Sequence, residues 1–256
     1  MRPEYAPNGL VGLLTPQANT TVEPEFSVLM PNGVTWLNAR LKSGKPSIRE
    51  RLIDYMDELP QSCRQFGNAP IEALALGCTG TAYFVGAARE DAILSGIAEE
   101  LKIPVFSAAT AVDHALQTLQ AKNIVLVSPY DGDVDEACGP YWIERGLSIK
   151  AKVQATGESG FHPIYSMNSS DGDQAMASLD TSGVDAIVIL GTGMPTLATL
   201  VRLHQRFACP VLSCMLCLGW RTACALDPTQ GDAAHLRQWA TGSHWSAQLS
   251  RFSKIK

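Results

Sequence analysis

The stretch Leu76-Gly77-Cys78-Thr79-Gly80 returns in altered form as Ile189-Leu190-Gly191-Thr192-Gly193, 113 residues further along the chain (191 − 78). In both copies an apolar run is followed at once by glycine and threonine. This order is typical of a buried strand that ends in a tight turn before a helix. Because the motif occurs twice, it predicts two structurally similar halves.

Two further echoes occur in the same order along the chain. Leu14-Thr15-Pro16 matches Val127-Ser128-Pro129 at the same offset (128 − 15), and Ile103–Ser107 matches Cys209–Ser213 at an offset of 106 (209 − 103), which a short deletion explains. We therefore predict two lobes related by a pseudo-twofold axis, followed by a C-terminal extension that packs on the outside. The first lobe is expected at residues 10–120, the second at residues 121–224, and the extension at residues 225–256.

Short runs rich in Val, Ile and Leu alternate with longer stretches of helical spacing, which predicts parallel sheets covered by helices. The expected fold is α/β, with two Rossmann-like lobes, strands buried on both faces, and an active site in the cleft between the lobes. Strands are expected at Leu10–Leu14, Val34–Leu41, Ile71–Gly77, Val105–Ser107, Ile124–Ser128, Ile149–Gln154, Ala186–Leu190 and Val211–Ser213. Helices are expected at Ser47–Phe66, Ala88–Leu101, Thr110–Gln120, Asp131–Arg145, Asp171–Leu179, Pro195–Phe207 and Met215–Leu226.

The composition excludes several classes of protein. Of 256 residues, 46% are hydrophobic and 18% charged, which excludes a disordered chain. The net charge of −5, with scattered basic residues, argues against a nucleic-acid partner. No apolar run reaches the ~18 residues of a membrane span, and Met1–Gly9 lacks a signal-peptide pattern. Seven cysteines, an odd number, indicate free thiols. We expect a cytoplasmic protein that binds neither membrane nor nucleic acid, with a homo-oligomer possible.

Cys78 is the candidate catalytic residue. It follows a predicted strand at the start of a predicted helix, where the helix N-terminus would lower a thiol pKa from about 8.5 toward neutrality. Such a thiolate is a nucleophile that needs no neighbouring histidine. The alternative is a cysteine that is merely tolerated in a turn. Its mate in the repeat is Gly191, so the expected cleft holds one thiol where a symmetric site would hold two.

The other candidates lie in the echoed strand exits, which should face each other across the cleft. Glycines there allow close approach of a ligand, while threonine hydroxyls and amide donors bind anionic oxygen. The predicted ligand is therefore a small mono- or dicarboxylate. An ordinary turn at Asn19 and a packing role for Tyr130 are the competing interpretations. The substrate-binding candidates are Thr15, Pro16, Asn19, Thr79, Gly80, Tyr130, Gly191, Thr192 and Gly193.

Cys214 and Cys217 form a CxxC pair after a predicted strand, the spacing of some redox and metal sites. No second CxxC or suitably spaced histidine completes a zinc set, and no GxGxxG or P-loop pattern follows a strand. We therefore predict no metal and no organic cofactor. Whether either cysteine lines the cleft stays open.

Three segments together resemble the maleate isomerase and arylmalonate decarboxylase branch of the Asp/Glu racemase superfamily. They are Leu14–Glu23 (LTPQANTTVE), Gly77–Thr81 (GCTGT) and Ser128–Tyr130 (SPY), and the resemblance spans about residues 10–224. It implies a pair of pseudo-symmetric lobes with the active site between them, and chemistry without a cofactor.

The resemblance also implies roles for single residues. Cys78 matches the nucleophile of maleate isomerases, Asn19 their carboxylate-binding asparagine, and Tyr130 a tyrosine that hydrogen-bonds a substrate carboxylate in both branches. Thr79 and Gly80, with Thr192 and Gly193 opposite, correspond to the oxyanion pocket. Gly191 stands where relatives carry a second-lobe cysteine, and the second-lobe asparagine of maleate isomerases is not evident in Glu158–Tyr165.

Four functions stay open from the sequence. A thiolate that adds to the alkene of a cis-enedioate would allow rotation to the trans acid, and this needs one nucleophile. A decarboxylase of the arylmalonate type would use the thiol of Cys78 as its proton donor. A racemase needs two acid–base groups and so comes third. A carboxylate-binding protein without turnover is the non-enzymatic alternative.

Overall fold

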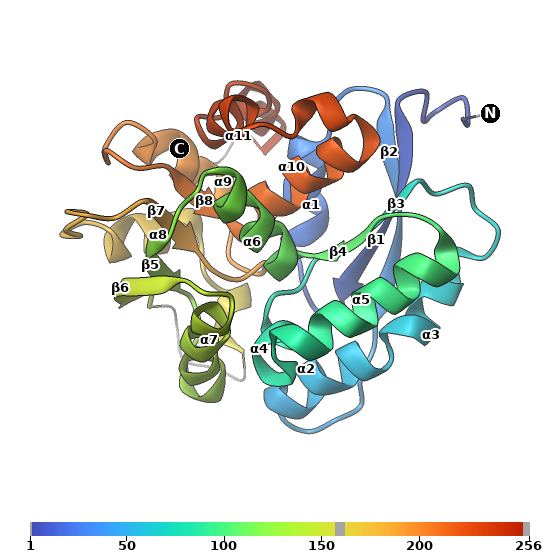
Figure 1. The fold of residues 1–256 in the computed structure, drawn as a ribbon, viewed down its shortest axis with the longest axis horizontal. Helices are drawn as coiled ribbons and strands as arrows, with labels where there is room; N and C mark the ends of the chain where they lie inside the picture. Colours follow the sequence, from blue (N-terminus) through green and yellow to red (C-terminus); the bar gives the residue numbers. More distant parts are fainter. Residues whose placement is uncertain (1, 157–161, 253–256) are drawn as a thin grey trace.

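The computed structural model describes residues 2–156 and 162–252, and it contains two four-stranded parallel sheets (Figure 1). The strand orders are β2-β1-β3-β4 and β6-β5-β7-β8, so the second sheet repeats the first strand for strand. This confirms the α/β fold and the internal repeat. The strands are β1 (Gly9–Pro16), β2 (Val34–Leu41), β3 (Ala73–Leu76), β4 (Val105–Ser107), β5 (Asn123–Ser128), β6 (Ser148–Gln154), β7 (Ala186–Ile189) and β8 (Val211–Ser213).

All eight predicted strands are present, but burial on both faces is wrong for two of them. β2 and β6 lie at sheet edges, and their residues are only partly buried, with β6 alternating between exposed and half-buried side chains. The central strands β1, β3, β5 and β7 are almost wholly buried. The strands at the opposite edges, β4 and β8, are almost wholly buried, so the exposure belongs to the β2 and β6 edges and not to edge strands in general.

The helices differ from the expected ones in two ways: one expected long helix is broken in two, and three short helices were not expected. The expected helix at Ser47–Phe66 is broken at Glu58, because Pro60 lacks an N–H and fits only the first turn of a new helix. Three short helices were not expected: α1, α4 and α11. The helices are α1 (Val22–Leu29), α2 (Ile48–Asp57), α3 (Leu59–Cys63), α4 (Gly80–Val85), α5 (Ala87–Leu101), α6 (Ala108–Thr118), α7 (Gly132–Glu144), α8 (Ser169–Ala175), α9 (Leu197–Leu203), α10 (Cys214–Leu226) and α11 (Ala233–Ala240).

The two halves pack closely on each other. Helices α6 and α10, which follow the last strand of each sheet, lie side by side, and the rings of His114 and Trp220 stack with centroids 5.4 Å apart (Figure 1). Helix α4 packs against α7 across the same boundary. Each of these four helices begins just after a strand ends. Their packing across the boundary therefore fixes the positions of the strand ends relative to one another.

The segment after α10 is held by aromatic anchors. Leu236, Trp239 and Trp245 are buried, and the indole N–H of Trp245 donates to the carbonyl of Trp239 at 2.9 Å. Within the described ranges, no helix is long and apolar enough to cross a membrane.

Candidate active site

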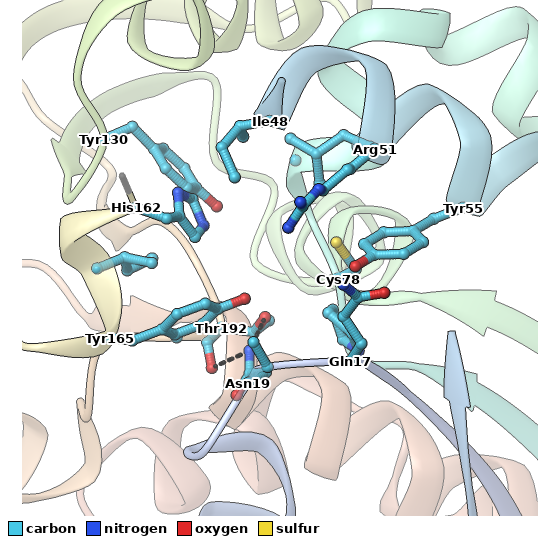
Figure 2. A pocket seen from close by; sticks show the side chains of 16 residues that line it. Gln17, Asn19, Ile48, Arg51, Tyr55, Cys78, Tyr130, His162, Tyr165 and Thr192 are labelled. Atoms are coloured by element: carbon cyan, nitrogen blue, oxygen red, sulfur yellow. Dashed lines mark hydrogen bonds between the residues drawn. The ribbon is translucent and has the colours of Figure 1, made fainter. Parts of the chain in front are cut away.

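The loops that follow β1, β3, β5 and β7 meet at the boundary between the halves and surround a cavity of about 190 Å³ (Figure 2). Drug-sized ligands occupy pockets of roughly 300 to 1,000 Å³, so this cavity suits a smaller molecule. The first half contributes Pro16, Gln17, Ala18, Asn19, Ile48, Arg51, Leu52, Tyr55, Cys78 and Gly80. The second half contributes Tyr130, His162, Ile164, Tyr165, Thr192 and Gly193.

Cys78 lies in this cavity, between the end of β3 and the start of α4. The N–H groups of Gly80 and Thr81 point at its sulfur, and the buried hydroxyl of Thr81, which has no hydrogen-bond partner among the described residues, lies close to it. These donors favour a thiolate and lower the pKa.

The expected near-neutral pKa of Cys78 is nevertheless wrong. The residue is only 4% exposed, and burial raises the pKa of its thiol to about 11 despite the donors around it. Helix α4 has only six residues and therefore supplies a weak dipole. With this pKa, Cys78 is a neutral thiol near neutral pH and needs a base before it can act as a nucleophile.

Asn19 lines the cavity and joins the two halves at the same time. Its amide nitrogen donates to the carbonyl and hydroxyl oxygens of Thr192, at 3.2 and 3.3 Å. Its amide oxygen accepts from the N–H groups of Thr21 and Val22 at the start of α1. The hydroxyl of Thr192 in turn donates to the carbonyl of Gly77 at 2.8 Å. Asn19 and Thr192 therefore hold the cavity floor together.

Three predicted substrate-binding residues lie behind the cavity wall. The hydroxyl of Thr15 donates to the side chain of Asn38 at 2.8 Å. Thr79 is fully buried, with its hydroxyl 2.9 Å from that of Tyr130. Gly191 has a φ of +81°, and a Cβ built there would lie 3.1 Å from the Tyr130 hydroxyl. Pro16, Asn19, Gly80, Tyr130, Thr192 and Gly193 do line the cavity.

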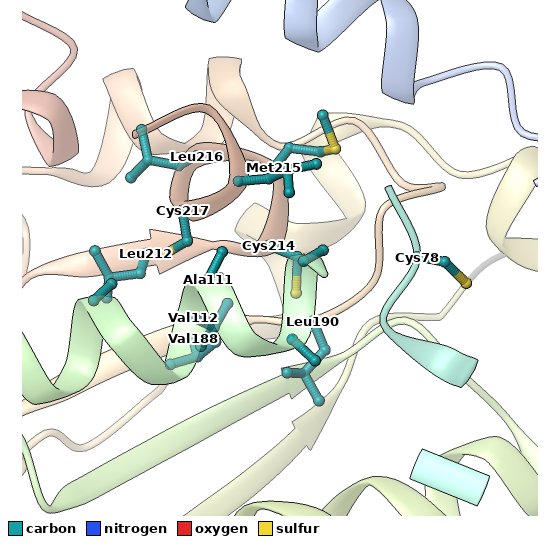
Figure 3. Packing of buried hydrophobic residues seen from close by; sticks show 14 of the residues in the cluster. Cys78, Ala111, Val112, Val188, Leu190, Leu212, Cys214, Met215, Leu216 and Cys217 are labelled. Atoms are coloured by element: carbon teal, nitrogen blue, oxygen red, sulfur yellow. The ribbon is translucent and has the colours of Figure 1, made fainter. Parts of the chain in front are cut away.

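The CxxC pair does not line this cavity. Cys214 and Cys217 are fully buried at the start of α10, among residues such as Leu190 and Leu212, while the sulfur of Cys78 points away from them (Figure 3). Burial raises the pKa of the Cys214 thiol to about 12. Both cysteines are core residues, and Cys78 carries the one thiol among the described cavity residues.

The sequence reasoning missed five polar residues of the cavity, one of which is Gln17 in the loop after β1. Arg51 and Tyr55 come from α2, and His162 and Tyr165 lie around the short 3-10 helix Pro163–Tyr165. Arg51 and Tyr55 are four residues apart in a helix with a polar face, so they lie on the same side and could have been grouped. Residues 157–161 lie outside the described part, and the described remainder of Glu158–Tyr165 carries no asparagine.

The described residues hold no cluster of three His, Cys, Asp or Glu side chains that could bind a metal ion. The cavity instead combines one thiol, one guanidinium, one imidazole and three phenols in a small space. This set can bind a small anion and move protons to and from it.

A sequence model of the arylmalonate decarboxylase family matches residues 11–237. The chain belongs to this family. The match covers both sheets and all the strand exits around the cavity. It also confirms the resemblance drawn from the three sequence segments.

Members and relatives of the arylmalonate decarboxylase family include enzymes of two kinds. A maleate isomerase from Nocardia farcinica is 27% identical over 219 residues, covering 79% of this chain and 84% of the relative. A maleate isomerase from Geobacillus stearothermophilus is 24% identical over 222 residues, covering 79% of this chain and 86% of the relative. The arylmalonate decarboxylase of Bordetella bronchiseptica is 21% identical over 229 residues, covering 82% and 87%.

Solved structures show the same fold. The maleate isomerase Iso from Pseudomonas putida S16 aligns with a TM-score of 0.77 at 20% identity, covering 86% of this chain and 93% of that one. A Nocardia farcinica maleate cis-trans isomerase mutant with a covalently bound succinylcysteine intermediate aligns with a TM-score of 0.76 at 24% identity, covering 90% and 98%. An arylmalonate decarboxylase structure aligns with a TM-score of 0.70 at 17% identity, covering 85% and 92%.

Proposed function

We propose that this protein is a cofactor-independent cis–trans isomerase of a small enedioate, of the maleate-to-fumarate type, with Cys78 as the nucleophile. The observation that carries the proposal is a single thiol in a small cavity that also contains Arg51. Addition of a thiolate to the alkene turns the central double bond into a single bond that rotates freely. Elimination of the thiolate then releases the trans acid.

The polar groups of the cavity favour a substrate with two carboxylates. Arg51 supplies a positive charge on the α2 side, and Tyr130 presents a hydroxyl from the opposite half (Figure 2). A guanidinium matches the two oxygens of a carboxylate, and a phenol O–H donates to one. One carboxylate can thus lie on each side of the sulfur, which places the alkene carbon near Cys78.

The relatives support this choice. Several of them are named maleate isomerase, including those that are 27% and 24% identical to this chain. One such isomerase has been solved with a covalently bound succinylcysteine intermediate, and a variant of another has been solved with maleate. We infer the same class of substrate here: a small dicarboxylate that binds covalently through cysteine.

A second candidate function is decarboxylation of an arylmalonate, with Cys78 as the proton donor. The raised pKa of about 11 favours it, because a thiol that stays protonated can deliver its proton to an enediolate. Ile48, Leu52 and Ile164 also line the cavity and offer an apolar wall for a ring. An arylmalonate decarboxylase with one glycine changed to cysteine and one cysteine changed to serine has been solved in a liganded form.

The experiment that tests the proposal is incubation with maleate and, separately, with phenylmalonate, followed by proton NMR. We expect fumarate to form from maleate in the wild-type protein and not in Cys78→Ala. Cys63→Ala serves as the matched control, because Cys63 is a buried cysteine of α3 outside the cavity. Phenylacetate without fumarate would replace the isomerase by the decarboxylase. If neither fumarate nor phenylacetate forms, both candidate functions are contradicted.

A further inference from the structure

The site lacks a second thiol, and the position of Gly191 shows why one does not fit. A Cβ at this residue would lie 2.8 Å from Cδ1 of Ile164 and 2.8 Å from Cγ of Pro129, with φ at +81°. The space beside Gly191 is thus filled by neighbouring side chains. A proton acceptor for the neutral thiol of Cys78 has to come from another residue of the cavity.

The second half places three side chains that carry protons in the cavity: Tyr130, His162 and Tyr165. Burial raises the pKa of both phenols, so they act as hydrogen-bond donors near neutral pH and not as bases. Burial lowers the pKa of His162 below 6.5, with Asp131 opposing this, so its imidazole is neutral and accepts a proton.

Inside the described part of the chain, the imidazole of His162 packs against a neighbouring ring and makes no hydrogen bond. Within residues 2–156 and 162–252, neither ring nitrogen has a hydrogen-bond partner, and its contact is an edge-to-face packing with Tyr165 at 4.9 Å between centroids. Pro163 restricts the backbone of His162 to extended conformations, which limits the directions that the ring can take. Figure 2 shows His162 on the side of the cavity opposite Cys78.

His162 also separates the cavity from a second hollow. That hollow has a volume of about 250 Å³, and His162 lines both spaces. A ring in this position can exchange its proton with water on one side and with a ligand on the other. The other titratable groups of the cavity are Cys78, Tyr55, Arg51 and Tyr165, and those of the second hollow are Arg49, Asp131 and Asp133. Tyr130 lines both spaces, as His162 does.

We propose that His162 is the acid–base residue of the site, acting across the cavity from Cys78 in place of a second thiol. The inference rests on the proposed isomerase function. His162 accepts the proton that leaves the Cys78 thiol. The resulting thiolate and imidazolium stabilise each other, because opposite charges attract strongly in a site of low dielectric constant.

The proton and electron balance is closed by these two residues. The thiolate forms a bond to one alkene carbon, and the π pair moves to the second carbon, which takes the proton from His162. The central bond rotates. His162 then removes a hydrogen from the second carbon, the double bond reforms, and the carbon–sulfur bond breaks. The proton that His162 then carries returns to the sulfur, which restores the neutral thiol of Cys78 and the neutral imidazole.

A single acid–base residue at a fixed position imposes a stereochemical outcome. Sulfur and His162 hold the same angle to each other during addition and elimination. Removal of the hydrogen that was just delivered regenerates the cis acid. The trans acid forms only after the central carbon–carbon bond has rotated by one third of a turn. This rotation brings to His162 the hydrogen that the second carbon already carried in the cis acid. Every molecule of trans product therefore keeps a hydrogen that came from His162, and hence from solvent.

The test is turnover of maleate in D₂O, with deuterium in the product measured by NMR and mass spectrometry. We expect one deuterium in each fumarate from the wild-type protein. His162→Gln keeps a polar side chain but cannot transfer protons, so its turnover should fall by about 100-fold. His244→Gln is the matched control, because His244 is exposed and lies outside the cavity.

Fumarate without deuterium from the wild-type protein, or full turnover with deuterium in His162→Gln, would overturn the inference. A wild-type protein that does not convert maleate would contradict the proposed function instead. The role of His162 is then decided by alkylation of Cys78 with iodoacetamide at pH 7. About tenfold slower labelling in His162→Gln than in the wild type supports the inference, and equal rates overturn it.

Discussion

Glu25 is a buried carboxyl group of α1 that reaches across to the second half. Its Oε1 accepts from the N–H groups of Thr196 and Leu197, at 2.5 and 2.9 Å. Its Oε2 lies 3.1 Å from the hydroxyl of Thr196, which also lies 2.9 Å from that of Ser213. When Glu25 is ionised, Thr196 donates to its carboxylate and can accept from the hydroxyl of Ser213. If Glu25 is protonated, it donates to Thr196, and Thr196 donates to Ser213.

The size of the effect follows from the pKa. Burial raises the pKa of Glu25 from 4.5 to about 7. Because the folded state holds its proton more tightly than the unfolded chain, the contribution to stability is complete below pH 4.5 and is lost as the pH rises through 7. At about 1.36 kcal/mol for each pH unit between the two pKa values, the loss is about 3 kcal/mol.

Glu25→Gln imitates the protonated carboxyl group at every pH. The variant should have a free energy of unfolding close to that of the wild type at pH 4.5 and about 3 kcal/mol above it at pH 8.5. Urea unfolding followed by tryptophan fluorescence measures both values. Glu99→Gln, at an exposed position of α5, is the control and should match the wild type at both pH values. A difference between Glu25→Gln and the wild type that stays constant with pH would refute the reasoning.

Three further results are expected. Cys78→Ser should lower turnover at least 1,000-fold, since a serine hydroxyl is a far weaker acid than a thiol and gives up its proton to a base much less readily, while thermal unfolding stays unchanged; activity near the wild-type level would exclude the thiol as nucleophile. Arg51→Gln should raise KM for a dicarboxylate about tenfold with a smaller change in kcat, whereas the same change at exposed Arg49 should leave KM alone; equal KM values would remove Arg51 from substrate binding. Gly191→Ala should lower the free energy of unfolding by about 1 to 3 kcal/mol in a urea titration, because its φ is positive and its Cβ meets Pro129; an unchanged midpoint would contradict this.

The strands could be predicted because their signal is local. Runs such as those at β3 and β7 are apolar throughout, and a central parallel strand needs no more than that. The internal repeat of the sequence then predicted the same succession of strands in both halves. Short helices were missed because α1 and α4 have eight and six residues, too few for a periodic pattern to emerge. Pro60 could have marked the break between α2 and α3.

The candidate site was predictable only as far as the repeat extends. Cys78, Asn19 and Tyr130 follow strands and were found, while Arg51 and His162 lie on elements between strands. Nothing local in the sequence says that these elements fold over the strand exits. The pKa of Cys78 was misjudged for a similar reason: the number of nearby N–H donors can be read from a turn, but the depth of burial depends on the whole fold.

The matching strand orders of the two sheets are what a tandem duplication leaves behind. In an ancestor made of two identical subunits, the twofold axis would have forced every change at the shared site to occur twice. Once both copies belonged to one chain, each could mutate alone. Cys78 and Gly191 occupy equivalent places and now differ, so one copy could keep a nucleophile while the other became free to shape the substrate's surroundings.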